Sequence, residues 1–205
     1  MELVKVFQSG GFFMYPILVV MAIGLAITLE RFLFLSKTQS STNKVWKNIV
    51  PMLRADDTPR AEKYVEQSRS PLSTILSYGF AKQRSNASRD SVEAAMEEGI
   101  MEVMPALEQR THYLATLANV ATLLGLLGTI IGLIQAFTAV ANADPAEKAN
   151  LLSASISVAM NTTAFGLCAA IPLLLFHSYL ATRTSKLVDS IEMAAVKCLN
   201  IMSKD

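Results

Sequence analysis

The sequence predicts an all-α integral membrane protein with three transmembrane helices. Its 205 residues are 52% hydrophobic and only 17% charged, which is more apolar than a typical soluble domain. Three segments are almost free of charge, and each exceeds the roughly 20 residues that a helix needs to cross a bilayer core. The net charge of +1 lacks the basic excess of nucleic-acid-binding proteins, so nucleic acid is not expected as a partner.

The first transmembrane helix is expected at residues 12–29. It belongs to an N-terminal region, 1–30, whose first residues are expected on the outer side of the membrane. Between Lys5 and Arg31 the only charged residue is Glu30. Pro16 falls in the first turn, where a missing N–H costs least. The apolar run passes into Glu30 and Arg31 without a small-residue cleavage site, so we interpret it as a retained anchor. Glu30, beside Arg31, is expected to form an interfacial ion pair.

Residues 31–110 are expected to form a soluble, helical domain. Pro51, Pro59 and Pro71 should divide its first part into short pieces, with helix starts at Asp57-Thr58-Pro59 and Ser70-Pro71. From Ser88 onward, apolar residues recur at steps of three and four into the second charge-free run. This period predicts one long helix that enters the second span, with Pro105 as the position where it would bend.

The second and third transmembrane helices are expected at residues 111–141 and 151–181, joined by a short loop at 142–150. Leu187, Ile191 and Cys198 keep the helical period after the third span. The third span and the C-terminal segment 182–205 should therefore form one helix to about Leu199.

Basic residues near the ends of the spans predict the orientation. Arg31, Arg110 and Arg183 border the first, second and third spans on the same side, whereas Lys5 and Lys148 lie on the other. Because cytoplasmic flanks carry the excess of Lys and Arg, we expect a periplasmic N-terminus, a cytoplasmic domain at 31–110 and a cytoplasmic C-terminus.

Small residues form a stripe on the second span and another on the third. Small residues let helix backbones approach closely, and such packing drives helix association in lipid, where helices gain no hydrophobic stabilisation from each other. The second-span stripe consists of Thr122, Gly125, Thr129, Gly132 and Ala136, and the third-span stripe of Ala159, Thr163, Gly166 and Ala170. The residues expected to pack helices are Gly125, Gly128, Gly132, Ala159, Gly166 and Ala170.

Polar residues cluster in the third span at Asn161, Thr162 and Thr163. A membrane hydroxyl often bonds a carbonyl one turn earlier, which we favour for Thr122. An asparagine is not satisfied as easily by its own helix, so the cluster around Asn161 either packs against protein or serves an ion path. Neither the second nor the third span contains Asp, Glu, Lys or Arg. If the protein moves ions, the titrating carboxylate must come from a partner.

No enzyme is expected from this sequence. It contains no phosphate-binding glycine loop, no metal-ligand cluster at workable spacing and no nucleophile with a base in reach. Cys168 and Cys198 are expected to be free thiols. We therefore expect no catalytic residue, metal or cofactor. A non-conducting helical scaffold is the alternative class of function.

The paired motifs of the second and third spans resemble the MotA/TolQ/ExbB proton channel family, with the ExbB and TolQ branch fitting best. They read LLGLLGTIIG at 123–132, TAFGL at 163–167 and AIP at 170–172. The resemblance implies a bacterial inner-membrane motor subunit, a homopentamer whose second and third spans line a pore. It also implies an ExbD-like single-span partner with a membrane Asp that carries the proton, and a TonB-like protein that receives the work for outer-membrane transport. A TolQ-like role in envelope maintenance is the nearest alternative.

The resemblance also assigns roles to residues of the two spans. Thr129 and Thr163 match the family's pore threonines, and Asn161 and Thr162 join them as candidates for the ion pathway. Three positions depart from the family pattern: Val158 stands where a glutamate is usual, Thr122 where a proline is frequent, and Thr162 where the family usually has Ala before its threonine. A pore richer in neutral oxygens would suit Na⁺, a hard cation, although we expect protons.

Overall fold

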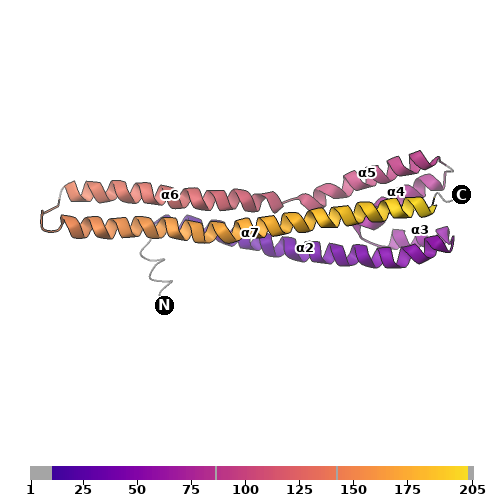
Figure 1. The fold of residues 1–205 in the computed structure, drawn as a ribbon, viewed down its shortest axis with the longest axis horizontal. Coiled ribbons are helices and arrows are strands. Elements are labelled where there is room, and N and C mark those ends of the chain that lie inside the picture. Colours follow the sequence, from indigo (N-terminus) through magenta and orange to yellow (C-terminus); the bar gives the residue numbers. More distant parts are fainter. Residues whose placement is uncertain (1–10, 86, 142, 203–205) are drawn as a thin grey trace. The chain divides into compact units, whose positions relative to one another are not determined.

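The computed structural model describes residues 11–85, 87–141 and 143–202, and every regular element in these ranges is a helix (Figure 1). The expected outer N-terminus at 1–10 and the end of the tail at 203–205 lie outside the described residues. The helices are α2 (Met14–Arg54), α3 (Thr58–Gln67), α4 (Pro71–Gln83), α5 (Arg89–Glu108), α6 (Thr111–Ala141) and α7 (Lys148–Met202).

Three helical stretches in the described part of the chain are long and apolar enough to cross a membrane: Met14–Arg54, Arg89–Ala141 and Lys148–Met202. The predicted all-α class and the three candidate spans are confirmed. The chain divides into two compact units. Unit 1 contains the described residues of 11–30 and 110–179, and unit 2 those of 31–109 and 180–202.

Unit 1 consists of the start of α2, all of α6 and the first part of α7. Many of its large apolar side chains point outward, including Phe137, Ile134 and Leu175, each at least 60% exposed. Such a surface is expected when the surrounding solvent is lipid rather than water. Its interior is formed mainly by small residues, which are described with the candidate site.

Unit 2 begins its short helices where the sequence predicts. The Asp57 carboxylate accepts a hydrogen bond from the Arg60 N–H at 3.3 Å, and Pro59 lies in the first turn of α3. Ser70 caps α4 in the same way, since its hydroxyl accepts from the Ser73 N–H at 3.1 Å. These caps satisfy N–H groups that have no partner within the helix. Both predicted helix starts are confirmed.

The core of unit 2 is apolar and draws on all five of its helical segments. Its buried residues include Ile49, Leu53, Val65, Leu72, Ile75, Leu76, Phe80, Val92, Met96, Leu187, Ile191 and Cys198. Burial raises the pKa of the Cys198 thiol to about 12, so this cysteine stays protonated at neutral pH. Across the surface of α4 and α5, the Tyr78 hydroxyl donates to Glu102 Oε2 at 2.6 Å, which raises the pKa of Tyr78.

Two expectations about helix ends are wrong. Pro51 does not end a helix, because α2 continues to Arg54. The buried side chains of Ile49 and Leu53 on either side of Pro51 hold this last turn against the core, which offsets the missing hydrogen bond. The second error is the single long helix into the second span: α5 ends at Glu108 and α6 begins at Thr111. Arg110 has a φ of 66°, which does not continue a right-handed helix.

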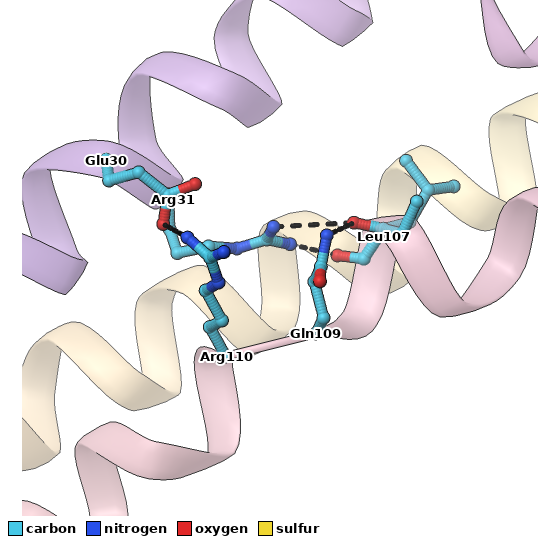
Figure 2. A network of polar contacts seen from close by, with 6 residues as sticks. Glu30, Arg31, Leu107, Gln109 and Arg110 are labelled. Atoms are coloured by element: carbon cyan, nitrogen blue, oxygen red, sulfur yellow. Dashed lines mark hydrogen bonds and ion pairs between the residues drawn. The ribbon is translucent and has the colours of Figure 1, made fainter.

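Arg31 explains why α5 ends where it does (Figure 2). Its side chain is fully buried in unit 2, and its guanidinium donates to the carbonyl oxygens of Leu107 and, at 3.4 Å, Ala106. The last carbonyls of a helix lack intrahelical donors and carry partial negative charge, so a cation is favourable there. The buried arginine therefore caps the C-terminus of α5.

Glu30 forms an ion pair, but with a residue far away in the sequence. Within unit 1, Glu30 Oε2 lies 3.5 Å from a guanidinium nitrogen of Arg110 (Figure 2). Adjacent residues of a helix point in different directions, so Glu30 and Arg31 engage different groups.

The sequence also predicted that the third span and the C-terminal segment form one helix. This is observed, because α7 is continuous from Lys148 to Met202.

The contact between α4 and α5 generates a stability prediction. A Cβ added to Gly99 would lie 2.9 Å from the Ile75 Cα, whereas one added to Gly79 would meet the flexible side chain of Met96 at 2.9 Å. We expect Gly99→Ala to lower the free energy of unfolding by about 1–3 kcal/mol, because backbone cannot yield. Gly79→Ala should change it by less than about 1 kcal/mol, because the gain in helix propensity offsets a small shift of Met96. Denaturant unfolding of the full chain in neutral detergent, followed by circular dichroism, measures both; equal losses would contradict the packing described.

Candidate functional site

The backbones of α6 and α7 touch within unit 1 at Gly125 and Gly166. A Cβ added to Gly166 would lie 2.8 Å from the Ala121 carbonyl oxygen and 3.0 Å from the Gly125 Cα. One added to Gly125 would lie 3.3 Å from the Cα atoms of both Gly166 and Thr163. Only glycine permits backbones to approach this closely, and in lipid such an approach holds helices together.

The close contact extends along both helices. Gly132 faces Ala159, where an added Cβ would lie 2.9 Å from the Ala159 Cβ, and Gly128 faces the methyl group of Thr162. Residue numbers fall along α6 as they rise along α7, so the two helices are antiparallel. Figure 1 shows α6 beside the first part of α7. Ala159 and Ala170 are buried.

Thr129 and Thr163 meet across this contact, and we call them the threonine pair. Their hydroxyl oxygens are hydrogen-bonded to each other. Thr163 Oγ1 also lies 3.0 Å from the carbonyl oxygen of Gly125. Thr129 Oγ1 lies 3.3 Å from that same carbonyl and 3.2 Å from the carbonyl oxygen of Ala159. The result is a cluster of four neutral oxygens, two from hydroxyls and two from the backbone.

The threonine pair has fewer protons than hydrogen-bonding contacts. Each hydroxyl supplies one proton and can accept two hydrogen bonds, while the pair takes part in four contacts. The two protons can therefore be distributed in more than one way without moving either helix. Either hydroxyl can donate to, or accept from, a further polar group, and neutral oxygens of this kind also suit a hard cation.

The threonine pair lies deep within the apolar stretch. Thr129 is 18 residues from the start of α6 and 12 from its end, which correspond to about 27 Å and about 18 Å along the helix axis at 1.5 Å per residue. Residues 111–141 and 149–181 contain no Asp, Glu, Lys or Arg. In the described ranges, no group of three or more His, Cys, Asp or Glu side chains could hold a metal ion. The pair is thus a polar, uncharged site in an apolar environment.

The other polar candidates occupy different positions. Thr162 is buried, and its hydroxyl donates to the Val158 carbonyl of its own helix at 3.0 Å. Its methyl group packs against Gly128, so Thr162 belongs to the helix contact rather than to the oxygen cluster. Asn161 is half-buried. Thr122 donates to the Ala118 carbonyl at 3.1 Å, which confirms the expected bond to its own helix.

Sequence reasoning missed the two carbonyl oxygens of the cluster. Thr129 lies four residues after Gly125, and Thr163 four residues after Ala159. A helical hydroxyl can reach the carbonyl four residues earlier, as Thr129 does at Gly125, and a small residue leaves its carbonyl open to a second helix, as Ala159 does to Thr129. The repeated spacing of a small residue and a threonine was therefore the available signal.

The chain is similar to known proteins over most of its length. Residues 67–193 match the model of the MotA/TolQ/ExbB proton channel family. A putative biopolymer transport protein ExbB homolog of Methanothermobacter thermautotrophicus is 32% identical over 92% of this chain and 66% of its own length. The putative biopolymer transport protein ExbB-like 3 of Synechocystis is 27% identical over 82% of this chain and 80% of its own length. The Tol-Pal system protein TolQ of Haemophilus influenzae is 35% identical over 44% of this chain and 40% of its own length.

These matches confirm the resemblance inferred from the paired motifs. The family match includes both motifs, since it extends from residue 67 to residue 193. The chain spans 66% of the length of the Methanothermobacter relative, slightly less than two thirds.

The backbone contact at Gly166 predicts a large effect from one methyl group. Gly166→Ala should lower the free energy of unfolding by about 1–3 kcal/mol, because the methyl would overlap the Ala121 carbonyl oxygen and neither backbone can move alone. Ala164→Val, at an exposed position of the same turn, is the control and should stay within about 0.5 kcal/mol. Reversible unfolding in mixed micelles measures both variants. A Gly166→Ala protein as stable as the control would show that the helices are not in backbone contact.

Proposed function

The chain belongs to the MotA/TolQ/ExbB proton channel family, and on this premise we propose that it is an ExbB-like subunit of an inner-membrane, ion-driven motor. With an ExbD-like single-span partner, it would use the proton motive force to energise a TonB-like protein that serves outer-membrane transport. The observation that carries this proposal is the threonine pair, a polar and uncharged site inside an apolar helix contact.

The partner would supply the titratable group that the second and third spans of this chain lack. A membrane-embedded Asp on the partner must exist both as a neutral acid and as a carboxylate during proton transfer. The neutral acid needs an acceptor and the carboxylate needs a donor, since an unpaired polar group in an apolar medium is costly. Each hydroxyl of the threonine pair can do either. The pair could therefore hydrogen-bond the carboxyl group before and after the proton moves.

The neutrality of the pair also fits its depth. A charged side chain fixed in the middle of a bilayer is expensive and would hold a passing proton or a partner carboxylate strongly. Hydroxyl and carbonyl oxygens bind more weakly and so allow release. The role of Thr129 and Thr163 is to position and hydrogen-bond the partner's titrating group rather than to titrate themselves.

The proposed topology follows the charges that border the candidate spans. Arg31 and Arg183 belong to unit 2 and Arg110 directly follows its last residue before the second span, so unit 2 would be cytoplasmic, along with the C-terminus, and the N-terminus periplasmic. In this topology residues 142–150 form the periplasmic loop.

A ring of copies is part of the proposal, with five as the number that the family resemblance implies. A single copy leaves large apolar side chains of α6 and α7 uncovered, such as Leu123 and Met160, which are 63% and 65% exposed. Neighbouring copies and lipid together would cover this surface. The mass of the intact assembly, purified with its partner, tests the number of copies.

Two variants of the function have specific support. A TolQ-like role in envelope maintenance is supported by the similarity to the TolQ protein of Haemophilus influenzae. A Na⁺-coupled motor is supported by the cluster of four neutral oxygens, which includes no titrating acid. Reconstituted vesicles given either a Na⁺ gradient or a proton gradient separate the two ions.

Removing either hydroxyl of the threonine pair should stop the motor. Thr129→Val and Thr163→Val keep the shape of the side chain but cannot hydrogen-bond the partner's carboxyl group, so energised uptake should fall by about tenfold or more. The measurement is transporter-dependent uptake in cells that carry the variant as their only copy, with co-purification of the partner as the check on assembly.

Thr122→Val is the matched control for these two variants. It removes a hydroxyl from the same helix as Thr129. This hydroxyl, however, donates to a carbonyl of its own helix, that of Ala118, at 3.1 Å. Its uptake should remain close to that of the unchanged protein. Full uptake in both Thr129→Val and Thr163→Val, with the partner still bound, would reject the ion path and favour the non-conducting scaffold.

A further inference from the structure

Unit 2 carries an open, apolar groove with an acidic rim between α5 and the last part of α7. Its volume is about 470 Å³. Met96, Ile100, Met101 and Met104 line it from α5, and Ala195, Val196 and Leu199 from α7; Glu93, Glu97 and Glu192 also line it, and we call these three glutamates its acidic rim. We propose that this groove binds a basic amphipathic helix, the cytoplasmic flank of the single-span partner. The identity of this occupant rests on the proposed function.

The apolar lining is unusual for the surface of unit 2. Large apolar side chains exposed in its described residues are Phe32, Leu33, Met101, Met193 and Val196. Met101 and Val196 line the groove, where they are 73% and 53% exposed, and Met193 lies one turn before Val196. Clustered apolar side chains with a polar rim mark docking surfaces, and methionines adapt to the shape of an incoming helix.

The charges around the groove define the sign of its partner. All three ionisable side chains that line it are glutamates. Two nearby cations are directed elsewhere: Lys197 Nζ lies 5.9 Å from the centre of the Trp46 ring, and Arg89 donates to Asn200 Oδ1 at 2.7 Å. Neither belongs to the lining. The rim is therefore negative at neutral pH and favours a helix with Lys or Arg beside its apolar face.

A second copy of this chain fits the groove poorly. Groove against groove, as in a two-fold dimer, would bring glutamates together, which is repulsive, and in a ring of copies the groove would instead meet a different surface of the neighbouring copy. The basic stretch of α2, with Lys37, Lys44 and Lys47, has the opposite charge but exposes no large apolar side chain from residue 34 to residue 54. Phe32 and Leu33 are exposed just before this stretch, which makes the start of the stretch the nearest match among the described residues of unit 2, and the mass of the assembly in the test below detects a neighbouring copy in the groove.

The cytoplasmic flank of a single-span protein has the required chemistry. Such flanks carry an excess of Lys and Arg, and a flank that continues the transmembrane helix would be helical. The groove extends along α5 from Glu93 to Met104, about 17 Å at 1.5 Å per residue, which is enough for about three turns of a bound helix. Helix-in-groove recognition of this kind uses apolar anchors spaced three and four residues apart.

The test uses a synthetic helical peptide of about 14 residues with Leu on one face and Lys on the other, labelled with a fluorophore. Fluorescence anisotropy measures its affinity for the full chain in nanodiscs of zwitterionic lipid. We expect saturable binding that weakens at least about tenfold when Glu93→Lys and Glu97→Lys are combined. Met101→Asp should weaken it similarly, and the same peptide with Glu in place of Lys should not bind.

Glu98→Lys is the matched control, because Glu98 is an exposed acid on the same helix outside the groove. Its affinity should stay within about twofold of the unchanged chain. Absence of binding, or equal weakening by Glu98→Lys, would overturn the proposal. So would groove variants that change the mass of the chain's own assembly but not its affinity for the peptide, since the groove would then join copies.

The groove and the ion path can fail separately. Peptide binding requires no ion gradient, so absent binding together with the expected loss of uptake in Thr163→Val rejects the groove alone. If the peptide binds but both threonine variants show normal uptake, the ion path is rejected. The bound helix would then no longer be identified as the flank of the motor's partner.

Discussion

Backbone contact between α6 and α7 is the constraint on which the candidate site depends. Helices gain no hydrophobic stabilisation from each other in lipid, so they are held by van der Waals packing and by interhelical hydrogen bonds worth about 0.6 kcal/mol on average and up to about 2 kcal/mol. Gly125 and Gly166 allow this packing because an added Cβ would meet the other backbone. The hydroxyls of Thr129 and Thr163 meet across the same contact and share the Gly125 carbonyl. Packing and site are therefore two consequences of the same small residues.

The absence of charge in these two helices shapes the function we propose. A carboxylate buried in the contact would need a permanent partner, because its cost in an apolar medium is high. The chain instead offers neutral oxygens whose protons can be rearranged, and so divides the work with a partner that brings the titrating acid. The buried cation of unit 2, in contrast, has a permanent partner and a structural role. Arg31 donates to carbonyl oxygens at the end of α5 and thereby defines where that helix stops.

The sequence correctly predicted the features that depend on neighbouring residues, namely helix starts and the continuity of a helix. Asp57 and Ser70 were identified as helix starts because a cap needs only a side chain and an N–H two or three residues away. The continuity of α7 followed from an unbroken period. Pro51 was misjudged because the packing of Ile49 and Leu53 outweighs its local effect. The end of α5 was also missed, since the apolar period continues past it and the arginine that caps it lies 76 residues away in the chain. For the site, the stripes put Thr129 and Thr163 on packing faces, but which threonine of the adjacent pair 162 and 163 places its hydroxyl in the oxygen cluster depends on the antiparallel register.

The central claim is that the two hydroxyls act together on one ion path. It is tested most directly by proton flux into liposomes that contain the chain and its single-span partner, measured with an internal pH-sensitive dye. The four proteins to compare are the unchanged chain, Thr129→Val, Thr163→Val and the double variant. If the hydroxyls act as a unit, the double variant should lose no more flux than the more severe single variant, because either change already breaks the path. Losses that multiply in the double variant, or flux that persists in all three, would contradict the account.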